Sequence, residues 1–290
     1  MRFEVSHSLT YEYSRPVHLQ PHVLRLRPRC DATQRVLQFR ISVTPEPSAR
    51  ADCIDLDGNT AVHLWFEKPT RHLEIRSRFA VETFRANPFN FVITHPGAFR
   101  LPLDYPEPEA PWLQPYRRAD LVTEAVKRFA WKIADEAGRE PLRFLSGLND
   151  HLYRTTDKVI RHKGNPYPSE RTLSERSGSC RDLAVLFMDA CRAVGLAARF
   201  VSGYEEGDRE RDDRDLHAWA EVYLPGGGWR GFDPSLGLAV AKRHVAVAAG
   251  GSYEGAAPIV GAFIGPGTEV TFEPDITMRV FDLDSKTVLS

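Results

Sequence analysis

The feature of this sequence that most constrains its fold is a change of hydrophobic period along the chain. Between Phe3 and Tyr13 every second residue is apolar or aromatic, with polar residues between them. The same period of two, typical of half-buried strands, recurs in three later runs, at residues 37–43, 62–66 and 73–81. Residues 1–86 are therefore predicted to form an antiparallel, sandwich-like β domain.

The pattern changes at residues 87–118, where proline dominates. Proline cannot donate to a helix or a sheet ladder, so this stretch is predicted to be a linker that wraps or spaces. Helical spacing follows, and three helices are predicted: one capped by Asp120 and ending near Gly138, one beginning at Pro141, and one running from Cys180 to Gly195. Residues 119–290 are assigned to a second domain, of the α+β class.

Composition narrows the possible partners and the compartment. The chain has 290 residues, a formal net charge of −1 and four scattered cysteines. It has no basic excess for nucleic acid, and no apolar run of the roughly 20 residues that span a bilayer, so neither nucleic acid nor membrane is an expected partner. Without a signal-peptide-like start or a disulfide framework, a cytoplasmic location with free thiols is expected.

One cysteine stands where a reactive thiol could be made. In the stretch ERSGSCRDLA, Cys180 follows a turn of small residues and begins an apolar helical pattern. Unpaired N–H groups and the positive end of the helix dipole at such a position stabilise a thiolate. A lone cysteine at a helix start is nevertheless more often packed than catalytic, so Cys180 needs partners elsewhere.

The stretch DLHAWAEVYLPGGGWRGFDPS, residues 215–235, supplies those partners. Its glycine-rich turn joins two predicted strands. If Leu224 pairs with Gly228 across a three-residue loop, Asp233 falls opposite Trp219 and diagonal to His217, within side-chain reach. A four-residue loop would send Asp233 to the other face of the sheet, so the register is a firm prediction.

A cysteine, a histidine and an aspartate in this arrangement form a nucleophile, a base and an orienting carboxylate. The histidine would take the thiol proton, because the thiolate is the nucleophile and a free thiol titrates at about 8.5. A zinc site made from Cys180, Cys191, His217 and Asp233 is disfavoured, because the sequence has no close ligand pair. No metal or organic cofactor is predicted.

Three blocks of the sequence resemble a known family. GSCRDLAVLFMDACRAVGLAARFVSGY, LHAWAEVYLPGGGW and GFDPSLGL are together similar to the core of the bacterial transglutaminase-like family, within the papain-like cysteine enzyme superfamily. LTYEYSRPVHLQPHVLRLRPR resembles the N-terminal domain that precedes that core in bacterial members. The resemblance implies a papain-like catalytic domain with Cys180 as nucleophile, His217 as base and Asp233 as orienting carboxylate.

The resemblance also implies acyl transfer through a thioester, with an oxyanion bound by a backbone N–H. Asn165 and Tyr167 are both candidates for the side-chain oxyanion partner, and the sequence does not select between them. Asp182 could contact substrate, form a helix-start salt bridge or clamp a loop, and Trp219 could shield the site from water or simply pack.

From these observations we expect an enzyme that acts on peptide, isopeptide or glutamine amide bonds of a peptide or protein substrate. Hydrolysis, as in a cysteine protease or amidase, is the leading prediction because water is always present. Cross-linking of glutamine to an amine, as in a transglutaminase, is the first alternative. A module that binds a peptide or polymer without catalysis is the second.

Overall fold

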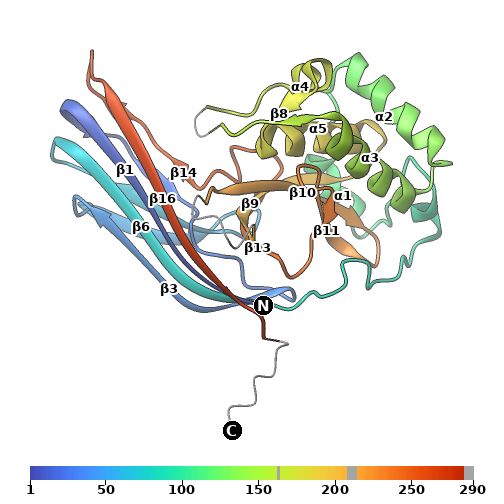
Figure 1. Cartoon of the computed structure of the whole chain (residues 1–290), viewed down its shortest axis with the longest axis horizontal. Coiled ribbons are helices and arrows are strands. Elements are labelled where there is room, and N and C mark those ends of the chain that lie inside the picture. Colours follow the sequence, from blue (N-terminus) through green and yellow to red (C-terminus); the bar gives the residue numbers. More distant parts are fainter. Residues whose placement is uncertain (162–163, 208–213, 284–290) are drawn as a thin grey trace, which may run out of the picture.

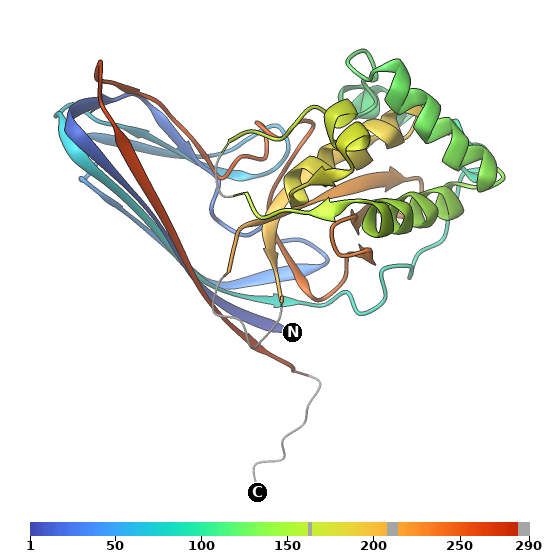
Figure 2. The same ribbon diagram turned by 45° about the horizontal axis from the view of Figure 1, so that its top comes forward.

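The protein is described here from a computed structural model covering residues 1–161, 164–207 and 214–283. Figure 1 shows two parts: long strands on the left, and helices packed around a second sheet on the right. Figure 2, turned by 45°, shows the same separation, with strands of the second sheet lying between the long strands and the helices. The fold is therefore α+β, with antiparallel sheets formed first along the chain, as predicted.

The larger N-terminal sheet is built around one long strand. β1 (Arg2–Leu19) pairs on one side with β6 (Thr70–Thr83), which in turn pairs with β3 (Gln34–Thr44), all antiparallel. Along β1 the alternation seen in sequence becomes an alternation of burial, with Phe3, Val5, Leu9 and Tyr13 buried. This confirms that the period of two reports half-buried strands.

A smaller sheet packs against the larger one and completes the sandwich. Its strand order is β14, β2, β5 and β4, with bounds Ile259–Val260, His22–Leu24, Thr60–Trp65 and Ala49–Ile54. Leu24 and Leu64 of this sheet share one apolar core with Leu73 and Ile75 of the larger sheet. The burial of this core holds the two sheets face to face.

The end of the chain returns to the N-terminal sheets, and this corrects the predicted domain limits. β16 (Val270–Phe281) pairs with the free side of β1 from Arg2↔Phe281 to Tyr13↔Val270. β15 (Phe263–Ile264) pairs with the end of β1, and β14 with β2. The assignment of all of residues 119–290 to the catalytic domain is therefore wrong for residues 259–281, because long strands pair with partners far away in sequence.

The domain predicted to be catalytic, called the catalytic domain below, packs four helices on a five-stranded sheet. The helices are α2 (Glu124–Glu136), α3 (Pro141–Thr155), α4 (Ser169–Glu175) and α5 (Cys180–Ala193). The sheet has the order β12, β11, β10, β9 and β13, with bounds Leu238–Ala239, Gly228–Asp233, His217–Leu224, Ala198–Glu205 and His244–Gly250. Phe187 of α5 stacks on Phe232 of β11, so α5 lies centrally against the sheet.

Two local predictions in this domain need correction. The first helix begins at Glu124 after Thr123, not at Asp120, whose exposed side chain pairs with Arg118 instead. The stretch 162–179 is polar and contains Pro166 and Pro168, which predicts a loop. It instead contains α4 and the short strand β8 (Ser177–Gly178), which pairs with β7 (Asp157–Lys158). Residues 162–163 of this stretch lie outside the described residues, as do residues 208–213 of the charged stretch 205–215, which the sequence also predicts to be a loop.

The proline-rich segment wraps the catalytic domain. It contains the short helices η1 (Pro96–Phe99), α1 (Ala110–Leu113) and η2 (Gln114–Tyr116). Between them Leu101, Leu103 and Tyr105 are buried in the catalytic core. The Tyr105 hydroxyl accepts a hydrogen bond from the Ala197 N–H at 2.8 Å and donates to the Tyr223 carbonyl at 3.1 Å. The sequence predicts a linker that either wraps around the next domain or spaces the two domains, and the structure shows that it wraps.

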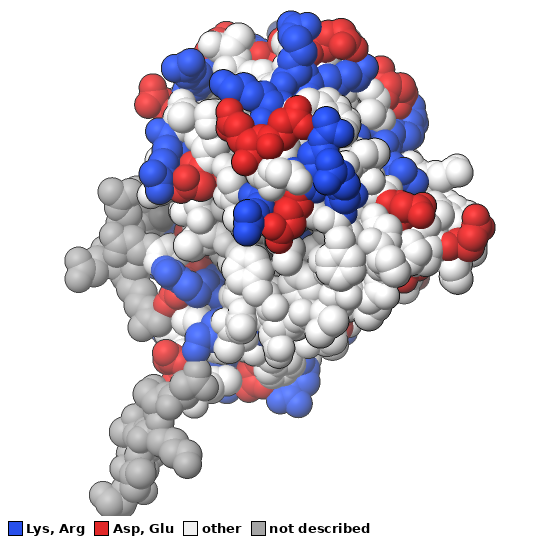
Figure 3. Space-filling model, turned by 90° about the vertical axis from the view of Figure 1, so that its right-hand side faces the viewer, with Lys and Arg blue, Asp and Glu red and all other residues white. Residues whose placement is uncertain are grey.

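The surface carries no single dominant charge on its helical side. Figure 3 shows positive and negative residues interspersed over one half of that face, while the other half is largely uncharged. This agrees with the near-zero net charge of the sequence. No helix within the described ranges is long and apolar enough to cross a membrane.

Candidate functional site

Cys180 is the first residue of α5, as the sequence predicts, and its side chain is partly exposed. The helix start is locked by a capping box. Both the N–H and the hydroxyl of Ser179 donate to Asp182 Oδ2 at 2.7 Å. Gly178 before it is closely packed, since a Cβ there would lie 3.0 Å from the Asp182 Cβ. The GSC stretch therefore fixes the thiol at the positive end of α5.

The hairpin of β10 and β11 has the predicted register. Leu224 pairs with Gly228 and Ala220 with Phe232, so the connection is a three-residue loop. Gly226 and Gly228 have φ values of 83° and 66°, which residues with side chains rarely adopt. This register places Asp233 on the same face of the sheet as His217, at the end where α5 begins.

His217 and Asp233 are in direct contact. His217 Nε2 lies 2.6 Å from Asp233 Oδ2, a short, charge-assisted hydrogen bond. The Cys180 thiol lies near enough to His217 to help raise the pKa of its ring. Because Nε2 faces Asp233, Nδ1 is the ring nitrogen available to Cys180. The structure thus brings together the three residues that sequence reasoning grouped.

The electrostatics of this contact favour a charged pair. Burial alone would lower the pKa of His217, but the charge of Asp233 and its hydrogen bond, with a smaller contribution from Cys180, hold that pKa well above its usual value. Burial would likewise raise the pKa of Asp233, but the charge and hydrogen bond of His217 hold it well below its usual range. The site favours an imidazolium beside a carboxylate.

Asp233 is fully buried and has donors on both oxygens. Its Oδ1 accepts hydrogen bonds from the Ser235 N–H at 3.0 Å, the Ser235 hydroxyl at 2.7 Å and the Leu236 N–H at 3.2 Å. Its Oδ2 accepts from His217 and also lies 3.1 Å from His244 Nε2. The carboxylate is therefore held in one orientation by its own turn and by two imidazoles.

Sequence reasoning missed His244. This residue begins β13, on the far side of β9 from the hairpin, and its side chain is buried. In the sequence it is only a histidine at the head of a short apolar run, eleven residues after Asp233. Nothing in that spacing indicates contact, since β10 and β9 lie between the strands of Asp233 and His244 in the sheet.

Trp219 packs in the interior rather than lining an open surface. Its side chain is almost fully buried in a cluster with Val201, Val240 and Ala249. The indole meets the His244 ring edge to face, with centroids 5.2 Å apart. Trp219 therefore forms a wall behind the two histidines, which agrees with the packing and shielding roles considered for it.

Asp182 acts as a clamp between the helix start and the preceding loop. Its Oδ1 forms an ion pair with Arg161 and accepts a hydrogen bond from the Tyr167 N–H at 2.6 Å. Arg161 in turn donates to the Asn165 carbonyl, and its guanidinium lies 3.9 Å from the centroid of the Tyr167 ring. Of the roles considered for Asp182, the structure shows the salt bridge and the loop clamp.

The two candidates for a side-chain oxyanion partner remain unselected. The Asn165 side chain is exposed, and the ring of Tyr167 lies between Arg161 and Arg171, 3.9 and 3.8 Å from their guanidinium carbons. Within the part of the chain that the structure describes, neither side chain forms a hydrogen bond to Cys180.

His217, Asp233 and His244 also form a group of possible metal ligands, with donor atoms within 4.8 Å of one another. Two ligands of a tetrahedral zinc ion lie about 3.3 Å apart, given bond lengths of about 2.0 to 2.2 Å. The 2.6 Å separation of His217 and Asp233 is shorter and matches a hydrogen bond. The observed distances therefore fit a carboxylate that accepts hydrogen bonds from two imidazoles.

Comparison with known proteins finds two family models that each match part of the chain. Residues 3–82 match the bacterial transglutaminase-like N-terminal region, and residues 132–234 match the transglutaminase-like superfamily. Over these two regions the chain is similar to transglutaminase-like proteins. The second match contains Cys180, His217 and Asp233.

Two proteins match this chain over nearly its whole length. An uncharacterized protein of Mycobacterium tuberculosis H37Rv is 29% identical over 90% of this chain and 87% of its own length. A crystal structure from Cytophaga hutchinsonii, whose protein is named as a candidate cysteine protease, has a TM-score of 0.72 at 21% identity. It covers 97% of this chain and 92% of that chain, so the two share a fold across both parts.

A shorter match concerns an enzyme. A protein-glutamine gamma-glutamyltransferase of Pseudomonas aeruginosa is 35% identical over 71 residues, which are 22% of this chain and 11% of that protein.

Proposed function

We propose that this protein is a cysteine-dependent acyl-transfer enzyme in which Cys180 is the nucleophile, His217 the base and Asp233 the orienting carboxylate. The observation that carries the proposal is the contact of His217 Nε2 with Asp233 Oδ2 at 2.6 Å, with the Cys180 thiol near enough to the same ring to help raise its pKa. The raised pKa of His217 supports a thiolate–imidazolium pair as the resting form.

The reaction begins when the Cys180 thiolate attacks the carbonyl carbon of an amide. The C–N bond then breaks, His217 gives its proton to the leaving amine, and a thioester to Sγ remains. Next, His217 takes a proton from water as the water oxygen attacks the thioester carbon. The C–S bond then breaks, which releases the acid and leaves the Cys180 thiolate beside the protonated His217. Asp233 stays ionised and holds the imidazole in place throughout.

The oxyanion formed at each attack needs a donor. As the first residue of α5, Cys180 has a backbone N–H without a partner inside the helix, and this N–H lies at the positive end of the helix dipole. We propose this group as the oxyanion donor, because it is fixed by the Ser179 and Asp182 capping box.

We propose hydrolysis of peptide, isopeptide or glutamine amide bonds in a peptide or protein as the main reaction. Water needs no binding site of its own, and the neighbour of similar fold is named as a candidate cysteine protease. Transfer of the acyl group to an amine is the second candidate, supported by the short match to a protein-glutamine gamma-glutamyltransferase. Binding of a peptide or polymer without catalysis is the third.

Cysteine alkylation tests whether the site is catalytic. Cys30 and Cys53 are exposed thiols and serve as internal standards, while burial raises the pKa of Cys191 well above its usual value. At pH 6 iodoacetamide is expected to modify the half-buried Cys180 far faster than Cys30 and Cys53. His217→Ala is expected to abolish that difference. Equal, slow labelling of the three accessible cysteines in the unmodified chain would overturn the proposal.

A second measurement separates the candidates for the acceptor. A glutamine peptide is incubated with the protein and a fluorescent primary amine, and the products are separated by mass. Free acid as the main product supports hydrolysis, and conjugate as the main product supports amine transfer. Cys180→Ser serves as the control that removes both products.

A further inference from the structure

The catalytic sheet ends in a strand that touches both the candidate active site and the N-terminal domain. β13 is an edge strand, paired on one side with β9 through His244↔Glu205 and Val245↔Tyr204. An edge strand normally presents unpaired N–H and C=O groups on its free side. In this protein that side is covered by side chains of the N-terminal domain.

Two primary amides imitate a neighbouring strand along the free side of β13. Gln34 donates through Nε2 to the Ala246 carbonyl and accepts through Oε1 from the Ala246 N–H, both at 2.8 Å. Asn59 donates to the Ala249 carbonyl at 2.7 Å and accepts from the Ala249 N–H at 2.9 Å. Each amide thus forms the pair of bonds that a strand would form. Both side chains are almost fully buried.

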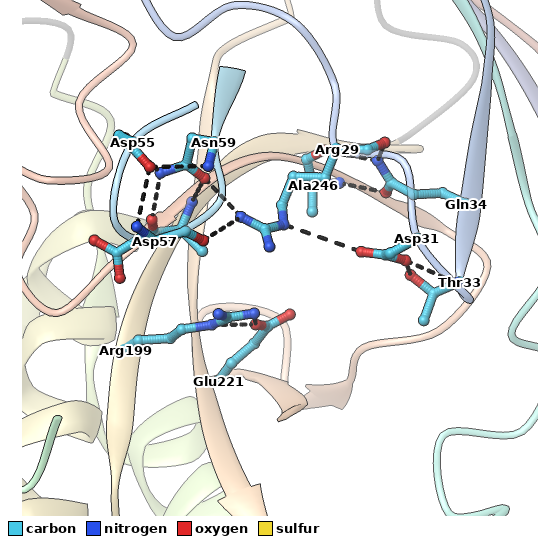
Figure 4. Close-up of polar contacts among 11 residues, drawn as sticks. Arg29, Asp31, Thr33, Gln34, Asp55, Asp57, Asn59, Arg199, Glu221 and Ala246 are labelled. Atoms are coloured by element: carbon cyan, nitrogen blue, oxygen red, sulfur yellow. Dashed lines mark hydrogen bonds and ion pairs between the residues drawn. The ribbon is translucent and has the colours of Figure 1, made fainter. Parts of the chain in front are cut away.

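The amides are themselves held by a polar network, shown in Figure 4. Arg29 donates to Asn59 Oδ1 at 2.6 Å, and its carbonyl accepts from Gln34 Nε2 at 2.7 Å. Asp55 accepts from Asn59 Nδ2 at 3.1 Å. Figure 4 also shows the Arg199 and Glu221 pair of the catalytic sheet beside this network. Gln34 and Asn59, called the β13 clamp below, are therefore held in orientation by residues of their own domain.

At the active-site end of β13, His244 meets the catalytic carboxylate. Its Nε2 lies 3.1 Å from Asp233 Oδ2, the oxygen that also binds His217. An ionised carboxylate only accepts hydrogen bonds, so Nε2 of His244 must carry the proton. Trp219 packs against the ring and leaves it little freedom. His244 can therefore fix the position of Oδ2 relative to His217.

We propose that His244 is a positioning residue for Asp233, and that the N-terminal domain keeps it in place by clamping β13 through Gln34 and Asn59. The inference rests on the proposed function. It gives the N-terminal β domain a role in the reaction, because the clamp fixes the strand that carries His244.

The test measures the rate of Cys180 alkylation at pH 6 in the full chain. His244→Phe keeps a ring against Trp219 but removes the donor, and it is expected to slow alkylation roughly tenfold, the equivalent of one hydrogen bond to a charged group. His244→Gln places an N–H donor near the same position and is expected to recover most of the lost rate. A purely structural role would not distinguish donor from non-donor in this way.

The clamp is tested by combining variants. Gln34→Leu is expected to slow alkylation several-fold, and the double variant Gln34→Leu with His244→Phe to be no slower than His244→Phe alone, because Gln34 acts through His244. Gln38→Leu, an exposed glutamine on the same strand, is the matched control and is expected to match the wild type. If Gln34→Leu does not fold, Asn59→Leu replaces it, and thermal unfolding establishes the folded fraction of each variant.

The outcomes separate this inference from the proposed function. If Cys180 of the wild type reacts no faster than Cys30 and Cys53, the proposed function fails. If the wild type reacts fast and His244→Phe reacts equally fast, only the positioning role of His244 fails. If the Gln34 and His244 effects multiply in the double variant, the clamp does not act through His244 and that part is overturned.

Discussion

Two histidines of this protein that are largely removed from solvent have opposite protonation preferences. His7 lies on β1, where the N-terminal sheet packs on the catalytic sheet, and its Nδ1 is 2.7 Å from the Tyr204 hydroxyl. His217 lies on β10, with Nε2 2.6 Å from Asp233. Burial lowers the pKa of His7 to about 4, whereas the carboxylate holds the pKa of His217 well above its usual value.

The difference teaches what sets the charge of a histidine in this fold. Both rings are largely removed from solvent and both have one short hydrogen bond, so neither burial nor hydrogen bonding alone decides the outcome. The partner of His7 is a neutral hydroxyl, and the partner of His217 is a carboxylate. A charged partner outweighs the desolvation of the imidazolium, and a neutral partner does not.

The largest effect is expected when the charged partner is removed. In Asp233→Asn, burial should dominate at His217 as it does at His7, so the imidazolium is lost. An ordinary thiol with a pKa of about 8.5 is only about 0.3% ionised at pH 6, so we expect Cys180 alkylation at pH 6 to slow by roughly two orders of magnitude. The rate of Cys180 alkylation is measured by quenching the reaction at successive times and quantifying the modified peptide by mass spectrometry.

Asp189→Asn is the matched control for this prediction, since Asp189 lies on α5 and binds the Ser169 hydroxyl at 2.6 Å, away from His217. It is expected to leave the rate of Cys180 alkylation unchanged. If Asp233→Asn reacted as fast as the wild type, the carboxylate would not be what sets the charge of His217.

The second prediction concerns His7 and the pH dependence of stability. Its folded pKa of about 4 lies below the unfolded value of about 6.5, so the unfolded state binds more protons between these values. The contribution of His7 to the free energy of unfolding is therefore full above pH 6.5 and is reduced by about 3 kcal/mol as the pH falls to 4.

Urea unfolding of the wild type and of His7→Phe across this pH range isolates the effect, because other groups titrate equally in both. The wild type is expected to lose stability relative to His7→Phe as the pH falls. Parallel curves for the two proteins would show that His7 is not held neutral in the folded state.

The smallest effect is expected when Tyr204, the neutral partner of His7, loses its hydroxyl group. Tyr204→Phe removes the hydroxyl and leaves the Nδ1 of His7 without that partner, which should lower the free energy of unfolding at pH 7 by about 1 to 2 kcal/mol. In the background of His7→Phe the same change should cost less, because no ring nitrogen is left unpaired. Equal costs in both backgrounds would mean that the two side chains do not stabilise each other.

The candidate site was largely predictable because its chemistry is encoded in short stretches. The position of Cys180 at a helix start follows from a local apolar pattern, and the register of the hairpin follows from glycines that permit a positive φ at Gly226 and Gly228. Both depend on neighbours in sequence. The proximity of Cys180 to His217 could only be assumed from the sequence, because it depends on how α5 packs on the sheet.

What the sequence did not reveal depends on long-range pairing. His244 of β13 reaches Asp233 of β11 although β10 and β9 lie between these strands in the sheet, and no spacing along the chain reports that approach. The side chains of Gln34 and Asn59 reach β13 from strands and turns about two hundred residues earlier. The strand character of β16 is partly visible in the sequence, because four apolar residues alternate with polar ones: Val270, Phe272, Ile276 and Met278. Pro274 interrupts this alternation.

The pairing of β1 with β16 has a consequence for how the chain folds. The two strands are neighbours over twelve register positions, yet they are separated by the whole catalytic sequence. Until residues 270–281 leave the ribosome, one side of β1 lacks its partner, and open strand edges are where chains associate wrongly. Assembly of the larger sheet must therefore wait for the last strand, and chains truncated before it are expected to aggregate even when the catalytic helices have formed.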